Sequence, residues 1–229
     1  MTTDYKLSGT KIFIRRLFKQ DIDLIIHCYE TFDTLYFNPM TPTFANELLL
    51  RGEIWGAFVG SKIVGCCYFF NANSEFFKAY NAYDVVADFT DNLEKYLYMG
   101  YIYADTEYVS GGIYQAFYNI AQVQGFRQGE KYILHSVPAK IPCDLHLLFE
   151  NGFKLVKLRG MDNLVVHYIF VKSLFTGDVI YNTNDYTTQL VCVENTKMLS
   201  KYLEHSYCGV ELLYKDDGAV LVLKQFNNL

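Results

Sequence analysis

A glycine-bearing turn between a predicted strand and a predicted helix is the part of this sequence best suited to bind a ligand. The run YADTEYVSGGIYQAFYNIAQVQGF places Gly111 and Gly112 directly before a helical pattern in which Ile113, Phe117 and Ile120 share one face. The first N–H groups of a helix have no partner within it, and the helix dipole favours negative charge there. Glycine lets an anion approach the backbone closely. A tight turn with a positive φ is the alternative reason for the second glycine.

Side chains near this turn could take part in proton transfer. Tyr101 and Tyr103 alternate with an isoleucine in the predicted strand, so both should lie on one face and line a pocket. Packing against a helix is the more common role of such rings, and it stays open. His135, in the next predicted strand, has an intrinsic pKa suited to a general base, although structural histidines are more frequent. We expect Asp105 and Glu107, just before the helix, to complement its dipole.

Composition and charge narrow the class of protein. The net charge is −5 at pH 7 and no run of basic residues stands out, so we expect no nucleic-acid partner. The apolar runs are far shorter than the about 20 residues of a membrane helix, and the N-terminus has no secretory signal. We therefore expect a cytoplasmic protein without a membrane partner. The six cysteines and five histidines lack the spacing of a metal site or a disulfide framework, which predicts reduced, buried thiols and no bound metal.

Periodicity and turn residues predict a mixed order of strands and helices. Asp21 stands where the N-cap of the first helix belongs, Gly60 at the turn of a tight hairpin, and Gly152 just past the end of a short helix. The predicted strands cover residues 11–17, 53–59, 62–70, 96–107, 131–137, 154–160 and 163–174, and the predicted helices cover 19–32, 43–50, 110–126 and 143–151.

A polar stretch rich in Asn, Thr, Asp and Gly, residues 175–188, predicts a boundary between two parts of the chain. The larger part is residues 1–174, and the remainder, 175–229, is a C-terminal appendage. Beyond the polar stretch come a strand (QLVCVE), a helix (NTKMLSKYLEHSY) and a hairpin (GVELLYKDDGAVLVLKQF), which make a small βαββ unit. This unit has no signature of its own. Completing an acceptor site, mediating dimerisation, or being the remnant of a duplicated half are the roles we consider for it.

Residues 11–172 resemble the GNAT superfamily of acyl-CoA-dependent acyltransferases. The segments that carry the resemblance are IFIRRLFKQDID, FVGSKIVGCCYFF, the glycine-bearing run above, and LLFENGF. The resemblance implies an α/β (α+β) fold with a mixed, mostly antiparallel central sheet and flanking helices, to which the C-terminal βαββ unit is added. Of the family's loop pattern only Gly112 matches, with Val109 and Tyr114 at the other positions.

The resemblance also implies a cofactor, acetyl-CoA or another acyl-CoA. Its pyrophosphate would lie at the glycine turn, and its pantetheine arm would lie between two splayed strands, 96–107 and 131–137. Catalytic roles would fall to Tyr101, Tyr103 and His135. The residues placed against the cofactor are Ile102, Ala104, Val109, Ser110, Gly111, Gly112, Ile113 and Tyr114.

The function that follows is transfer of an acyl group, most simply acetyl, to an amine of a small molecule or a peptide. The alternative is a GNAT-like protein without catalytic activity that binds a ligand or a protein partner, since fold alone does not decide activity. A homodimer is left open. Acetyl-CoA binding distinguishes the two functions.

Overall fold

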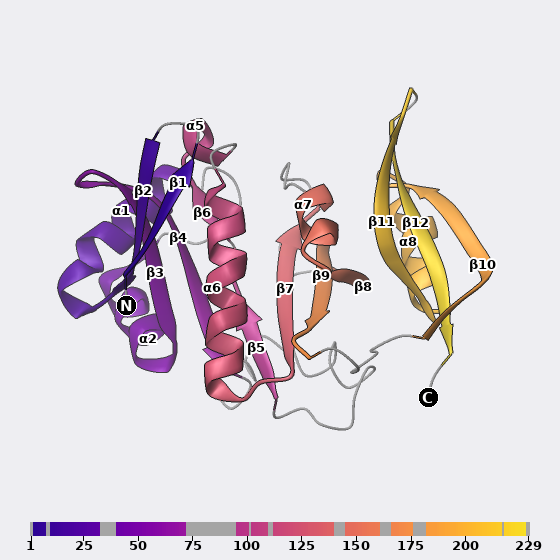
Figure 1. Cartoon of the computed structure of the whole chain (residues 1–229), viewed down its shortest axis with the longest axis horizontal. Coiled ribbons are helices and arrows are strands. Elements are labelled where there is room, and N and C mark those ends of the chain that lie inside the picture. Colours follow the sequence, from indigo (N-terminus) through magenta and orange to yellow (C-terminus); the bar gives the residue numbers. More distant parts are fainter. Residues whose placement is uncertain are drawn as a thin grey trace.

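The computed structural model shows a long twisted sheet with helices packed on it (Figure 1). The structure describes residues 2–7, 10–32, 40–71, 95–100, 102–109, 112–139, 145–160, 166–175, 182–216 and 218–227. The strands within them are β1 (Thr2–Leu7), β2 (Thr10–Leu17), β3 (Glu53–Val59), β4 (Lys62–Asn71), β5 (Tyr96–Met99), β6 (Tyr103–Ala104), β7 (Tyr132–Pro138), β8 (Lys154–Gly160), β9 (Val166–Ser173), β10 (Asn182–Cys192), β11 (Tyr207–Lys215) and β12 (Gly218–Asn227). The helices are the 3-10 turn η1 (Lys19–Asp21), α1 (Ile22–Phe32), α2 (Pro42–Arg51), α5 (Thr106–Val109), α6 (Ile113–Gln128), α7 (Leu145–Glu150) and α8 (Thr196–Leu203).

The described strands form one sheet of order β1-β2-β3-β4-β5-β7-β9-β8-β11-β12-β10, with β6 also paired to β4. Among the described strand pairs only β5 and β7 run parallel, and the others are antiparallel. The predicted class, a mixed and mostly antiparallel sheet with flanking helices, is therefore confirmed. The predicted C-terminal βαββ order is present as β10, α8, β11 and β12, and its three strands belong to the same sheet.

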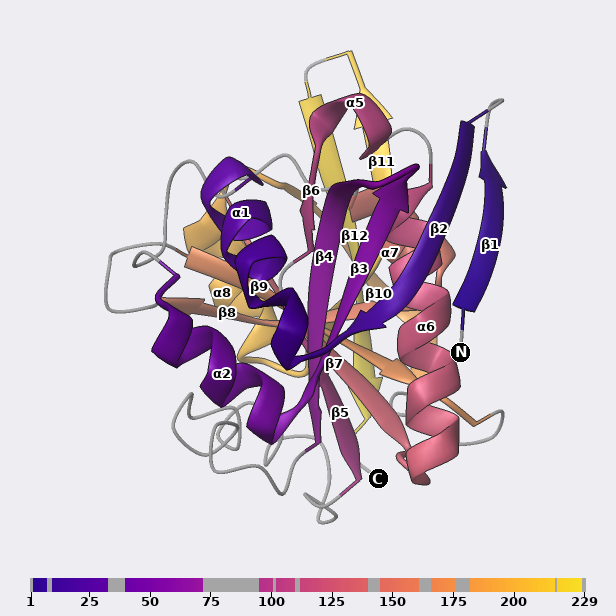
Figure 2. The same ribbon diagram turned by 90° about the vertical axis from the view of Figure 1, so that its left-hand side faces the viewer.

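Helices cover both faces of the N-terminal half of the sheet. Figure 2 shows α1 and α2 on one side of β3 and β4 and α6 on the other. On the first face Ile25 and Leu48 pack with side chains of β3 and β4. On the second face Phe117 of α6 belongs to a larger cluster that continues into the C-terminal unit through Leu199 of α8 and Leu221 of β12. The apolar face of each helix thus fixes which side of the sheet it covers.

Most of the predicted elements before residue 72 are present, and one strand was missed. The predicted strand 11–17 corresponds to β2, and the predicted hairpin to β3 and β4, with Gly60 at a φ of 59° in its turn. The missed strand is β1, which lies at the sheet edge and pairs antiparallel with β2 from Thr2 opposite Arg15 to Leu7 opposite Thr10. Its sequence, TTDYKL, has little apolar alternation, so periodicity gave no signal for a strand there.

The prediction of one continuous strand over residues 96–107 is wrong. The segment divides into β5, β6 and the short helix α5. β4 pairs with both strands, placing Phe69 opposite Met99 and Cys66 opposite Tyr103. Tyr103 is four residues after Met99, whereas their partners in β4, Cys66 and Phe69, are three residues apart. The extra residue is the register shift of a β-bulge. Gly100 lies at this point, where an added Cβ would come within 1.9 Å of the Tyr68 ring.

The division of the chain at residues 174 and 175 stays a prediction, and residues 176–181 lie outside the described part. The C-terminal unit meets the larger part at a sheet edge, where β11 pairs antiparallel with β8 through Gly209 and Leu155. The thiols of Cys28 and Cys208, like those of two neighbouring cysteines in β4, are buried and free, while Cys192 is exposed.

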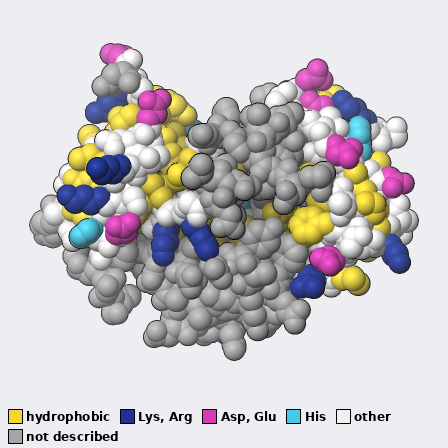
Figure 3. Space-filling model, turned by 180° about the vertical axis from the view of Figure 1, so that it is seen from behind, with side chains coloured by type: hydrophobic (Ala, Val, Ile, Leu, Met, Phe, Trp, Pro, Cys, Tyr) yellow, Lys and Arg dark blue, Asp and Glu magenta, His cyan; other side chains and the backbone are white. Residues whose placement is uncertain are grey.

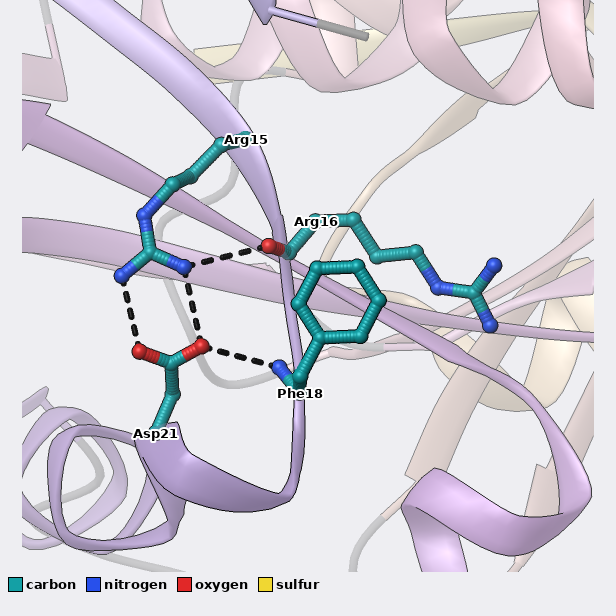
Figure 4. A network of polar contacts seen from close by, with 4 residues as sticks. All are labelled: Arg15, Arg16, Phe18 and Asp21. Atoms are coloured by element: carbon teal, nitrogen blue, oxygen red, sulfur yellow. Dashed lines mark hydrogen bonds and ion pairs between the residues drawn. The ribbon is translucent and has the colours of Figure 1, made fainter.

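A buried carboxylate connects β2 to the first helix. The Asp21 side chain accepts two hydrogen bonds from the Arg15 guanidinium, at 2.8 and 2.9 Å, and one from the backbone N–H of Phe18 at 2.9 Å (Figure 4). Asp21 thus closes the turn that leads into α1, instead of capping the N–H groups beyond it as the sequence predicted. The hydrogen bonds from Arg15 hold the pKa of Asp21 below its usual value although burial opposes them.

We expect Asp21→Ala to lower the free energy of unfolding at pH 7 by about 2 kcal/mol, because it leaves the guanidinium and the Phe18 N–H without these partners. Asp23→Ala is the matched control, since Asp23 is exposed in the first turn of the same helix. It should change the free energy by less than about 0.5 kcal/mol. Urea denaturation measures both.

The sign of the pH dependence follows from the lowered pKa of Asp21. Its stabilising contribution is present above the pKa of the unfolded chain and is lost as pH falls through the folded value. The difference between wild type and Asp21→Ala should therefore shrink on acidification. A difference that is constant with pH, or equal losses in the two variants, would contradict this role.

Candidate functional site

Hydrogen bonding between β5 and β7 stops partway along the sheet. The two strands pair in parallel from Tyr96 opposite Tyr132 to Met99 opposite His135. Beyond this point β6 pairs with β4, while β7 continues beside β9 as far as Pro138. In Figure 1 the strands lie together at the lower end of β7 and separate toward its upper end. Among the described residues, 136–138 of β7 have no strand on the side that β5 occupies lower down.

The N-terminus of α6 lies at the same end of the sheet as this separation (Figure 1). Its N-cap is Gly112, which has no side chain to act as a cap. The first hydrogen bond within the helix runs from the Ala116 N–H to the Gly112 carbonyl oxygen at 2.9 Å. The N–H groups of Ile113, Tyr114 and Gln115 therefore have no acceptor inside the helix.

Two other helices show how a side chain normally fills this role. Thr41 Oγ1 accepts from the Phe44 N–H at the start of α2, at 3.2 Å. Asn195 Oδ1 accepts from the Met198 N–H at the start of α8, at 3.1 Å. The helix α6 instead begins at a glycine and has no side-chain cap, and the positive end of its dipole favours an anion there.

Two glycines shape the start of α6, one at its N-cap and one in the strand beneath it. Gly112 has a φ of +83°, a left-handed conformation that costs other residues strain. The sequence left two roles open for it, and the positive φ establishes the structural one. Gly65 in β4 lies below the helix start, where an added Cβ would meet the Tyr103 carbonyl oxygen at 2.9 Å and the Ile113 side chain at 3.4 Å. The absence of a side chain there lets α6 begin directly above β4 and β6.

An ion pair holds the short helix that precedes α6. Asp105 Oδ2 accepts from Lys62 Nζ at 3.0 Å, and Asp105 Oδ1 accepts from the Glu107 N–H at 3.1 Å. Asp105 therefore caps α5 and attaches it to the start of β4. This agrees with the expected role of a carboxylate near a helix N-terminus, at α5 rather than at α6.

The residues expected along the cofactor lie partly in the core. Ile102 and Ile113 are fully buried, and the ring of Tyr114 packs in the larger apolar cluster. The Tyr114 ring is thus part of the core. Ala104 is half-buried in β6, and Val109 is the last residue of α5. Ser110 and Gly111 lie outside the described residues, as does Tyr101.

Two of the three expected catalytic side chains lie on opposite faces of the sheet. The Tyr103 ring is 4.5 Å from the ring of Tyr29 in α1, centroid to centroid. His135 instead faces α6, where its ring lies 5.9 Å from that of Tyr118, and it is 6.3 Å from the ring of Phe153, just before β8. The structure therefore does not bring Tyr103 and His135 together. Their catalytic roles stay a prediction.

Burial keeps the imidazole of His135 neutral. Its Nδ1 donates to the Met99 carbonyl oxygen at 3.0 Å, which leaves the proton on that nitrogen. Burial lowers the pKa of His135 to about 4, although this hydrogen bond opposes the shift. The hydrogen bond from His135 to Met99 joins the last residue pair of β5 and β7. It therefore stabilises their pairing just before the strands separate.

A serine–histidine pair that the sequence did not predict lies on the opposite face of β7. Ser136 Oγ and His167 Nδ1 are 2.9 Å apart. Burial, with a smaller contribution from Arg159, lowers the pKa of His167 to about 4. The two residues come from β7 and β9, and only the register of those strands brings them together. Strand alternation alone gives no signal for such a pair.

The described residues contain no group of three or more His, Cys, Asp or Glu side chains that could hold a metal ion. Among the same residues, no helix is both long enough and apolar enough to span a membrane.

Solved structures of acetyltransferases share this architecture. An N-acetyltransferase from Staphylococcus aureus Mu50 matches with a TM-score of 0.56 and 13% identity, over 72% of this chain and 99% of its own. The ribosomal-protein-S18-alanine N-acetyltransferase from Escherichia coli matches with a TM-score of 0.54 and 14% identity, over 79% and 99%. A chain of the NatC complex, solved with Gag peptide and CoA, matches with a TM-score of 0.53 and 15% identity, over 72% and 99%.

Other matching structures are acetyltransferases of the GNAT family. The chain has the GNAT fold. No protein-family model and no curated protein matches its sequence, so the likeness is one of structure.

We expect Gly112→Ala to lower the free energy of unfolding by about 1 to 2 kcal/mol, because an L residue is strained at a φ of +83°. Gly112→Asn should cost less, since Asn tolerates this conformation better than Ala. Thermal unfolding of the two variants measures the difference. An alanine variant as stable as wild type would contradict the left-handed assignment.

We also expect the protonation of His135 to lower the stability of the protein in acid. Because its folded pKa lies below that of the unfolded chain, its contribution to stability is lost as pH falls from about 6.5 to about 4. His135→Asn keeps a donor for Met99 but cannot be protonated, so it should lose less stability over this range, by about 2 kcal/mol.

The quantity to measure is the difference between the variant and wild type in urea denaturation at several pH values. Glu130 acts with the opposite sign, because burial raises its pKa to about 7, and its effect cancels in that difference. If the free energies of unfolding of wild type and His135→Asn change equally with pH, His135 is not the buried neutral group.

Proposed function

We propose that this protein transfers an acyl group, most simply acetyl, from acyl-CoA to an amine of a small molecule or a peptide. The observation that carries the proposal is the N-terminus of α6, which lacks a side-chain cap and lies where β5 and β7 separate. An anion-binding helix end beside two strand edges suits a long cofactor with phosphates at one end. The GNAT fold of the chain supports the same reading.

The residues present fit a coenzyme A cofactor. The N–H groups of Ile113, Tyr114 and Gln115 would donate to the pyrophosphate, where the helix dipole adds to the attraction. Residues 136–138 of β7 offer backbone groups to the amides of the pantetheine arm. When bound, acyl-CoA would supply a thioester whose acyl carbon forms the bond to the amine nitrogen, and CoA would leave as the thiol with the proton that the amine gives up.

The chain's own contribution to the reaction is positioning and the handling of one proton. The attacking amine must be unprotonated, and it loses a proton as the new bond forms. The imidazole of His167, held neutral beside Ser136, is a polar group near the separated edge that can orient the amine. Tyr103 and His135 remain proposals for proton transfer, together with Tyr101. Holding the reactants in contact supplies a large share of the rate of such a transfer.

The acceptor is proposed to be a small or peptidic amine. Figure 3 shows Lys and Arg side chains interspersed with Asp and Glu over the described residues of one face, without a concentrated basic stripe. The net charge of −5 favours the approach of cationic amines. A peptide acceptor is in keeping with the E. coli neighbour, whose substrate is the alanine of a ribosomal protein. We further propose a cytoplasmic location.

A second candidate function is binding of acyl-CoA or a partner without catalysis. It is favoured by the burial of Tyr103 and His135, on opposite faces of the sheet. Acetyl-CoA binding without any release of CoA thiol, over a panel of amines and peptides, would establish this second function.

Gln115 allows the helix end to be tested with a matched pair of variants. Gln115→Pro removes one backbone donor at a position in the first helical turn where proline is tolerated. Gln115→Ala removes the same side chain, with its hydrogen bonds to Asn119 and Asn151, but keeps the N–H. We expect the proline variant to bind acetyl-CoA about tenfold more weakly than the alanine variant, about 1.4 kcal/mol.

Calorimetry with wild type and the two variants gives the affinities, and circular dichroism checks that both variants fold. S-acetylpantetheine, which lacks the pyrophosphate, should bind weakly and equally to both variants. Equal acetyl-CoA affinities for the two folded variants would remove the helix end from the site. Failure of wild type to bind acetyl-CoA at all would overturn the proposed function.

A further inference from the structure

The C-terminal unit repeats the element order and strand pairing of the segment before it. Strand, helix, strand and strand follow one another as β7, α7, β8 and β9, and again as β10, α8, β11 and β12. In the first set the order in the sheet is β7-β9-β8, and in the second it is β10-β12-β11. In each set the third strand lies between the other two and pairs antiparallel with both.

The two sets also agree in register. Aligning β7 with β10 so that Leu134 corresponds to Thr188 places Val137 on Val191, and both valines are buried. The same spacing in sequence carries β8 onto β11, with Leu155 on Gly209. Corresponding positions on the third strands also face the same cluster, as Tyr168 and Leu221 do.

Two local irregularities occur at corresponding positions. The turn after α7 contains Gly152 with a φ of 80°, and the turn after α8 contains Ser206 with a φ of 63°, which is uncommon for a residue other than glycine. The pairing of β8 with β9 shifts register between Leu155 and Lys157, and that of β11 with β12 shifts between Gly209 and Glu211. A shared topology does not require either feature, so their coincidence indicates two copies of one unit.

The two units meet as the halves of a two-fold dimer do. β8 and β11 are corresponding strands, they pair antiparallel, and the residues that face each other, Leu155 and Gly209, are themselves counterparts. The helices also exchange partners, since α8 packs on β8 and α7 packs on β11. In a two-fold interface, if one element of the first copy contacts a second element of the other copy, their counterparts make the same contact in reverse. The axis passes between Leu155 and Gly209.

We propose that residues 132–173 and 186–226 are two copies of one βαββ unit, and that the C-terminal copy binds the β8 edge in the way a second subunit would. The β8 edge is thus an interaction surface whose partner is a second copy of the unit, supplied by the same chain. The backbone groups of an edge strand are a template for pairing, and β11 satisfies this one. The inference does not depend on the proposed function.

The copies differ where the candidate site lies. Ser136 and His167 form a polar pair in the first copy, and their counterparts in the second are Leu190 and Val220. The second copy therefore carries no equivalent of this pair. Its role is to complete the sheet, and the polar residues belong to the copy beside the separated strands.

The pair on the axis must be asymmetric. An added Cβ at Gly209 would come within 2.9 Å of the Cβ of Leu155. A side chain can occupy this space from either copy but not from both. Two-fold symmetry predicts that the side chain can be moved from one copy to the other.

The test is an exchange of the axial pair in the full chain. Gly209→Leu alone should lower the melting temperature by at least about 5 °C through overpacking, and Leu155→Gly alone should lower it by leaving a cavity. In the double variant the leucine fills the corresponding space from the other copy. The double variant should lose less than half the sum of the two single decreases in melting temperature.

The matched control joins Gly209→Leu with Leu97→Gly, which removes an equally buried leucine from β5 of the same core, and its losses should be additive. Recovery in the axial double variant with additivity in the control supports the proposal. Additive losses in both double variants would overturn it. If Gly209→Leu does not fold, Gly209→Ala replaces it, with Leu155→Ala and Gly209→Ala/Leu155→Ala as partners. Recovery that is no better than additive overturns the proposal there too.

Discussion

The hydrogen bonds that β4 makes to the segment beside it govern the arrangement of the site. β4 pairs with β5 as far as Met99 and with β6 from Tyr103, and the register shift between them bends the segment toward β4. A strand that follows β4 in this way leaves β7, whose pairing with β5 ends at His135. Gly100 permits the bend because the Tyr68 ring occupies the space that a Cβ would need. The imidazole of His135 stabilises the last pair of β5 and β7 through its hydrogen bond to the Met99 carbonyl oxygen.

The helix start depends on the same bend. Because β6 crosses close to Gly65, α6 can begin directly above the separated edge, with Ile113 and Tyr114 packed in the core and their N–H groups at the helix end. Glycine at position 112 turns the chain into the helix without supplying a cap. The part of β7 that β5 no longer pairs with and the start of α6, which has no side-chain cap, therefore lie at one end of the described sheet. At the other side of β9, the C-terminal copy covers the edge of β8 that the first copy would leave open.

The sequence predicted the elements better than the contacts between them. Alternation in β2, β3 and β4 and the turn at Gly60 predicted these elements, because local pattern decides them. The fold itself was predicted from the resemblance of residues 11–172 to the GNAT superfamily. The break at Gly100 could not be predicted from tyrosine-rich alternation, since it arises from the register between β4 and its two partners. The pairing of Ser136 with His167 was missed for the same reason. Tyr103 and His135 have the chemistry of catalytic residues in the sequence, but strand alternation does not tell which face a neighbouring helix will bury.

The claim that the end of α6 is an anion site for acyl-CoA is tested most directly by amide NMR during titration with acetyl-CoA. We expect saturable shifts of the Ile113, Tyr114 and Gln115 amides, with no shift at Met198, whose N–H already bonds to Asn195 at the start of α8. S-acetylpantetheine, without phosphates, should leave the first three amides unchanged. Saturable binding of acetyl-CoA that shifts amides elsewhere and leaves the start of α6 unchanged would contradict the account.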